Sequence, residues 1–138
     1  MPASSEIYVR DATTFVHVLQ GDYAVSDQAD TILTTILGSC VSTCISDTVA
    51  GIGGMNHFLL PGNATEDRQS IRYGLHAMEL LINELMKQGA RRETMQAKIF
   101  GGAQVMHNFT TMNVGERNTN FVLNYLHTER IPIVSEDV

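Results

Sequence analysis

The 138-residue sequence has no tryptophan, three prolines and two cysteines, and its fifteen acidic residues outnumber nine basic ones. Cys40 and Cys44 are too few and too close together to build a disulfide framework. We therefore expect a protein of the reducing cytoplasm. In that compartment a free cysteine is either a small core residue or a reactive thiol.

Long apolar runs and dense basic segments are also missing. No stretch approaches the roughly 18 consecutive apolar residues of a membrane-spanning helix. The first residues lack the basic and apolar regions of a signal peptide. The net charge is −6, and the densest basic cluster is Arg91, Arg92 and nearby Lys87. Nucleic acid needs a basic face, so we expect neither nucleic-acid binding nor membrane insertion.

The composition itself is that of a folded protein, with 43% hydrophobic and 17% charged residues. The length corresponds to one domain, which we expect to span residues 1–138. Segments rich in β-branched and aromatic residues predict strands in the first half of the chain. These segments are residues 14–19, 23–25, 31–37, 41–46 and 52–60.

The second half mixes helical and strand patterns. A polar loop over residues 61–69 precedes apolar residues at helical spacing, which predict a helix over about Ser70–Gln88. Ser70 is its expected N-cap, and Gly89 is the expected residue just past its end. A strand at 97–100, a helix at 115–129 and a strand at 131–134 are expected to follow. The class is α/β or α+β with a mixed sheet.

The predicted hairpin of residues 41–60 brings a thiol close to an imidazole. If its turn is centred near Thr48–Val49, Cys40 lies opposite His57 or a neighbour, and such pairs have Cβ atoms about 4.5–5.5 Å apart. The histidine can then take the thiol proton. Gly38 and Ser39 leave backbone N–H groups free for an oxyanion. A register slip of one residue would separate the pair, and about three such pairs in four are structural or accidental.

Several separated motifs add to this local signal. In order they are Leu37-Gly-Ser-Cys-Val41, Gly53-Gly-Met-Asn-His-Phe-Leu-Leu-Pro61, Arg72-Tyr73, Ala97-Lys-Ile-Phe-Gly-Gly-Ala-Gln104 and Val114-Gly-Glu-Arg-Asn118. Together they resemble the CheD family, the chemoreceptor glutamine deamidases of bacterial and archaeal chemotaxis. The resemblance covers about residues 20–138.

Site residues follow from this resemblance by position. It implies Cys40 as the nucleophile, His57 as the general base, and a third catalytic hydroxyl six positions before the cysteine. That position is Thr34, and an offset of one would give Thr35 instead. The resemblance also implies an α/β layered sandwich with mixed sheets and two main helices, related to the catalytic domain of cytotoxic necrotizing factors.

The residues after the predicted strand at 97–100 belong to the same expected site. Gly101 and Gly102 are not followed by the Lys-Ser/Thr of a P-loop, so we expect close packing beside the active site and a contribution to oxyanion or substrate binding. Gln104 is expected to contact the substrate. The C-x3-C spacing and the other histidines predict no metal site, and no cofactor is expected.

The activity that the resemblance implies is hydrolysis of glutamine side chains to glutamate on receptor helices, through a thioester on the cysteine. Methyl-accepting chemotaxis proteins and a CheC-type phosphatase are the expected partners. Two alternatives stay open, a binding module without catalysis and a cysteine amidase with another substrate. Relatives usually continue past residues 131–138, so the domain is expected to be short at its C-terminus.

Overall fold

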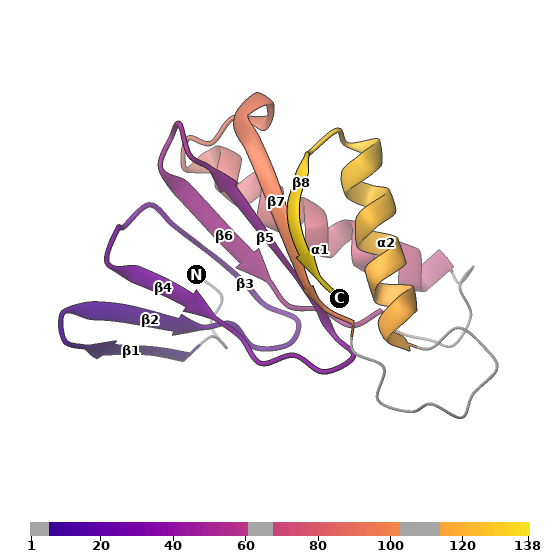
Figure 1. Cartoon of the computed structure of the whole chain (residues 1–138), viewed down its shortest axis with the longest axis horizontal. Helices are drawn as coiled ribbons and strands as arrows, with labels where there is room; N and C mark the ends of the chain where they lie inside the picture. Colours follow the sequence, from indigo (N-terminus) through magenta and orange to yellow (C-terminus); the bar gives the residue numbers. More distant parts are fainter. Residues whose placement is uncertain (1–5, 61–67, 103–113) are drawn as a thin grey trace.

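Two β-sheets and two helices form three layers in the computed structural model, which describes residues 6–60, 68–102 and 114–138 (Figure 1). A small core between the sheets contains Val16, Val18 and Ala24, and a larger core lies between the second sheet and the helices. The predicted mixed α/β class with two main helices is confirmed.

The smaller sheet has the order β1-β2-β4, with β1 at Glu6–Arg10, β2 at Thr13–His17 and β4 at Thr31–Thr34. Strands β1 and β2 are antiparallel, whereas β2 and β4 are parallel. Strand β1 was not predicted, because all five of its residues are exposed and carry no alternating pattern. It is stabilised across the ladder, where the rings of Tyr8 and Phe15 stack with centroids 5.0 Å apart.

The larger sheet has the order β3-β6-β5-β7-β8. Its strands are β3 (Tyr23–Ser26), β6 (Ile52–Asn56), β5 (Val41–Asp47), β7 (Met95–Gly101) and β8 (Ile133–Asp137). Strands β7 and β8 are parallel, and the other neighbours are antiparallel. The sheet is therefore mixed, as predicted, and β5 lies at its centre.

Strand β5 confirms the predicted alternation of its side chains. Val41, Thr43 and Ile45 are buried and face the helices, where the Thr43 hydroxyl lies 3.6 Å from the sulfur of Met78. The alternate residues of β5 face the smaller sheet. Successive residues of a strand project to opposite faces, so one short sequence separates the main core from the side that carries the predicted site.

Helices α1 (Arg68–Lys87) and α2 (Val114–Thr128) cover the core face of the larger sheet. Both overlap their predicted ranges. Gly89 has a φ of +113°, and Ala90 N–H donates to the carbonyl of Leu85, which confirms the predicted end of α1. The expected N-cap is wrong, because Ser70 lies inside α1 and is buried. Residues 61–67 of the predicted loop lie outside the described residues.

The register of the β5–β6 hairpin differs from the prediction by two residues. Cys44 lies opposite Met55, and Val41 forms an isolated bridge with Phe58. The cause lies in the turn, where a carboxylate oxygen of Asp47 accepts hydrogen bonds from the N–H groups of Val49 and Ala50. A shift by an even number of residues preserves the face on which each side chain lies.

Two predicted strands end earlier than expected. Strand β4 stops at Thr34 and β6 at Asn56, although strands over 31–37 and 52–60 were predicted. The Thr35 hydroxyl donates to the carbonyl of Val18. His57 N–H donates to the carbonyl of Asp22, the next pair in the β3–β6 register. His57 lies next to the start of β5, because the following residue, Phe58, forms a bridge with Val41.

Candidate active site

Cys40 and His57 are placed by the same pair of backbone hydrogen bonds. Val41 and Phe58 exchange N–H···O bonds of 3.0 Å each, and Cys40 and His57 are the residues that precede them. When the ladder is continued, Cys40 and His57 occupy diagonal positions on one face, which correspond to Cα separations of about 7–8 Å. The direct pairing considered from the sequence is thus wrong, but the shared face is retained.

The imidazole of His57 is held by a hydroxyl group. Its Nδ1 lies 2.8 Å from Oγ1 of Thr35 and 3.4 Å from the carbonyl oxygen of Val18, and the residue is 7% exposed. The hydroxyl donates its single proton to the Val18 carbonyl at 2.7 Å. It must therefore accept from Nδ1–H. This assigns the Nδ1–H tautomer, which leaves the Nε2 lone pair available as a base.

Burial lowers the pKa of His57, and positive charge on nearby His17 lowers it further, while the Val18 carbonyl acts in the opposite direction. Removing an imidazolium from water is unfavourable, so the neutral ring is preferred. A neutral imidazole is the form that can accept a proton at physiological pH.

The thiol of Cys40 donates a hydrogen bond of 3.6 Å to Oε1 of Gln20. Burial raises the pKa of Cys40, whereas its own backbone N–H lowers it. Among the described residues, the hydrogen-bond partner of this thiol is therefore a glutamine carboxamide and not the imidazole of His57. The raised pKa of the Cys40 thiol and the lowered pKa of His57 both favour the neutral pair over a thiolate–imidazolium ion pair.

The two neighbouring threonines contact different histidines. The hydroxyl of Thr34 lies 3.3 Å from Nδ1 of His17, its partner across the β2–β4 ladder, whereas the hydroxyl on His57 belongs to Thr35. The sequence had indicated Thr34 and left Thr35 as the alternative offset. The sequence analysis gave His17 no role, and its position beside Thr34 follows only from the pairing of β2 with β4.

Two glycines lie against the backbone of Cys40. Gly102 N–H donates to the Cys40 carbonyl at 2.8 Å. Gly101 has a φ of +103°, and a Cβ atom there would collide with the same carbonyl oxygen. The expected close packing of this glycine pair is therefore confirmed, while a contact with substrate stays a prediction. A Cβ at Gly38 would meet nothing, so that side of the turn is open. Gln104 lies outside the described residues.

Asn118 of α2 is a polar residue that the sequence interpretation did not assign to the site. It is fully buried, its Nδ2 donates to the carbonyl of Ser39 at 2.8 Å, and its Oδ1 accepts from Leu60 N–H at 2.9 Å. A sequence signal was present, because Asn118 precedes the buried Val122 by one helical turn and thus lies on the apolar face.

Comparison with known proteins gives this geometry a context. Residues 59–138 match the family model described as CheD chemotactic sensory transduction. The chain is 59% identical over 140 residues to a protein of Albidiferax ferrireducens named probable chemoreceptor glutamine deamidase CheD 1. That match covers 99% of the chain and 59% of the relative.

Two further relatives carry the name probable chemoreceptor glutamine deamidase CheD. The protein of Cupriavidus metallidurans is 54% identical over 128 residues, which is 89% of this chain and 58% of the relative. The protein of Rhizobium etli is 56% identical over 122 residues, which is 86% of this chain and 65% of the relative. The chain belongs to the CheD family. It spans about three fifths of the length of the first relatives it matches.

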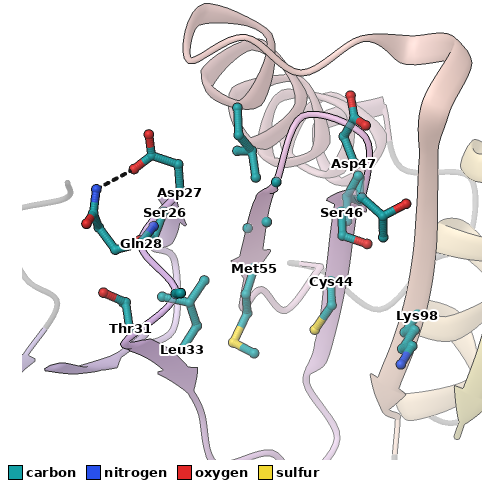
Figure 2. A pocket seen from close by; sticks show the side chains of 17 residues that line it. Ser26, Asp27, Gln28, Thr31, Leu33, Cys44, Ser46, Asp47, Met55 and Lys98 are labelled. Carbon is teal, nitrogen blue, oxygen red and sulfur yellow. Dashed lines mark hydrogen bonds between the residues drawn. The ribbon is translucent and has the colours of Figure 1, made fainter. Parts of the chain in front are cut away.

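A cavity of about 670 Å³ in this CheD-family chain opens between the two sheets, and neither Cys40 nor His57 lines it. Figure 2 shows Leu33 of β4, Met55 of β6 and Cys44 of β5 around it. Burial raises the pKa of the Cys44 thiol. None of the predicted catalytic residues lines this cavity.

Within the described residues, no group of three or more His, Cys, Asp or Glu side chains could hold a metal ion. Neither helix of the described chain is long and apolar enough to span a bilayer.

Proposed function

We propose that this chain hydrolyses the side-chain carboxamides of specific glutamines on chemoreceptors to carboxylates. Cys40 is the nucleophile, His57 the general base and Thr35 the residue that orients the imidazole. The hydrogen bond of 2.8 Å between Thr35 and His57, beside the turn that carries Cys40, is the observation on which the proposal depends. The printed names of the relatives support the substrate class. The proposed compartment is the reducing cytoplasm, where free cysteines such as Cys40 and Cys44 persist.

The mechanism begins with proton transfer from the Cys40 thiol to Nε2 of His57. The thiolate then attacks the side-chain carbonyl carbon of the glutamine, and the backbone N–H of Cys40 stabilises the oxyanion. The His57 imidazolium gives its proton to the departing ammonia, which leaves a thioester. His57 next removes a proton from water, which attacks the thioester and releases glutamate and the free thiol.

Gln20 supports the idea that a carboxamide fits beside the thiol. It lies in a tight turn in which Asp22 N–H donates to the carbonyl of Leu19, with Gly21 at a φ of +90°. Gly21 N–H donates to the His57 carbonyl at 2.7 Å, so the turn is attached to the backbone of the proposed base. An incoming glutamine has to replace the Gln20 carboxamide at the sulfur, and the thiol is then free to turn toward His57.

The predicted partnership with a CheC-type phosphatase rests on the family resemblance alone. A non-catalytic binding module and an amidase with another substrate are the outcomes against which the proposal is tested.

The test is incubation of a cognate chemoreceptor with the protein, followed by mass spectrometry of the receptor peptides. Wild type is expected to convert specific glutamines, detected as the small mass gain from amide to acid, and Cys40→Ala is expected to convert none. Cys44→Ala is the matched control, because this thiol lines the separate cavity, and it should retain conversion. Conversion by Cys40→Ala, or none by folded wild type, would refute the proposal.

A further inference from the structure

Asn118 connects helix α2 to both halves of the proposed site. Its Nδ2 reaches the carbonyl of Ser39, directly before Cys40, and its Oδ1 reaches the N–H of Leu60, three residues after His57. The side chain is fully buried, so no water competes for either bond at its surface. One asparagine therefore links the turn of the nucleophile to the segment of the base.

The Leu60 end of this connection is anchored by a second residue. Arg117, the neighbour of Asn118 on α2, donates from its guanidinium to the Leu60 carbonyl at 2.7 Å. Both backbone groups of Leu60 are thus bound by consecutive residues of one helix. This arrangement fixes the position of the Asn118 carboxamide and leaves its Nδ2 directed at Ser39.

A hydrogen bond to the Ser39 carbonyl oxygen also orients the whole peptide group between Ser39 and Cys40. The carbonyl of Ser39 and the N–H of Cys40 belong to one planar peptide group and point in opposite directions. Fixing the oxygen therefore fixes the direction of the N–H. The next peptide group is held as well, because the Cys40 carbonyl accepts from Gly102 N–H at 2.8 Å. The backbone of Cys40 is restrained on both sides.

The nitrogen of Cys40 lies three bonds from its own sulfur, and its N–H lowers the pKa of the thiol against the effect of burial. In the tetrahedral intermediate the oxyanion sits on the carbon bonded to that sulfur. A donor aimed at this region can stabilise both the thiolate and the oxyanion.

We propose that Asn118 is a positioning residue of the deamidation site, which aims the backbone N–H of Cys40 at the developing negative charge by holding the carbonyl of Ser39. Asn118 does not touch the substrate. This role rests on the proposed function, but its effect on the thiol is measurable without any receptor.

The test compares Asn118→Leu with Asn124→Leu, both in a Cys44→Ala background. Asn118→Leu keeps the approximate shape of the side chain and removes both hydrogen bonds, whereas Asn124→Leu changes an exposed asparagine on the same helix. For Asn118→Leu we expect kcat for receptor deamidation to fall about 10- to 100-fold with KM within about twofold of wild type. The pH midpoint of Cys40 alkylation by iodoacetamide should move upward. Asn124→Leu should not move that midpoint.

If Asn118→Leu does not fold, a measurement on the wild-type protein takes its place. In wild-type protein, the NMR shift of the Cys40 amide proton should follow the titration of the thiol. A Cys40 amide that is insensitive to this titration, or a folded Asn118→Leu with wild-type kcat and alkylation profile, would overturn the role of Asn118. If the alkylation midpoint moves while wild type deamidates no receptor, the proposed function fails and the positioning role stands.

Discussion

Two histidine–threonine pairs lie next to each other between the sheets, and they differ in what surrounds them. His17 and Thr34 face each other across the β2–β4 ladder at 3.3 Å, whereas His57 and Thr35 meet at 2.8 Å outside regular strands. Consecutive residues of an extended chain project to opposite sides, so adjacent threonines serve different histidines. Only the second pair adjoins the Cys40 turn. The same residue types thus differ in the segments that surround them.

The largest expected effect separates the two histidines. His57→Gln should lower receptor deamidation by about 10²- to 10⁴-fold, the usual contribution of a general base. His17→Gln should keep the rate within about threefold of wild type, because His17 contacts Thr34 and is the smallest of the causes that shift the pKa of His57. Initial rates from mass spectrometry of receptor peptides measure both. Equal losses in the two variants would remove the distinction between the pairs.

Substitution of Thr35 is expected to lower receptor deamidation more than substitution of Thr34, but by less than substitution of His57. Thr35→Val keeps the shape but removes the acceptor for Nδ1–H, and kcat should fall about tenfold because the tautomer and ring orientation are no longer fixed. Thr34→Val is the matched control and should stay within about twofold. A large loss of kcat in Thr34→Val alone would contradict this assignment. Thr34, the residue that the family resemblance implies, would then be the third catalytic residue.

Gln20 contacts the Cys40 thiol, close to the His57–Thr35 pair. Removing the Gln20 side chain should therefore change the reactivity of this thiol. Gln20→Ala removes the carboxamide that accepts the thiol proton, so Cys40 should be alkylated about two- to fivefold faster at neutral pH in a Cys44→Ala background. Gln28→Ala, which changes an exposed glutamine, is the control. Unchanged alkylation in Gln20→Ala would show that the contact does not protect the thiol.

The smallest effect concerns stability and follows from the burial of His57. Burial lowers the pKa of His57 in the folded protein below its ordinary value of about 6.5, so the unfolded chain binds more protons below that pH. The neutral His57 ring therefore contributes fully to the free energy of unfolding above about pH 6.5, and this contribution is lost as the pH falls toward the pKa of His57 in the folded protein. Urea unfolding at several pH values should show this decrease in wild type and a weaker one in His57→Gln. Identical slopes would mean that His57 titrates alike in both states.

The sequence predicted the parts of the fold that repeat with a regular period. The buried faces of α1 and α2 and the alternation of β5 follow from spacing, because burial selects apolar residues at every turn or every second position. The motif also indicated Cys40 and His57, which directly precede the two residues, Val41 and Phe58, that exchange backbone hydrogen bonds.

The remaining features depend on contacts between distant segments. The hairpin register was displaced because Asp47 binds two N–H groups of the turn, which spacing does not reveal. The contact of His57 with Thr35 depends on the path of the chain after β4, where the Thr35 hydroxyl also bonds the carbonyl of Val18. Asn118 contacts Ser39, 79 residues earlier in the chain, so only the packing of α2 reveals it.

The central claim is that Thr35 holds His57 as the tautomer whose Nε2 is free to serve Cys40. Long-range ¹⁵N–¹H NMR of the histidine ring nitrogens tests this directly in the wild-type protein near neutral pH. We expect a proton on Nδ1 and a bare Nε2 for His57, and loss of this preference in Thr35→Val but not in Thr34→Val. A proton on Nε2 of His57 in the wild type would contradict the account.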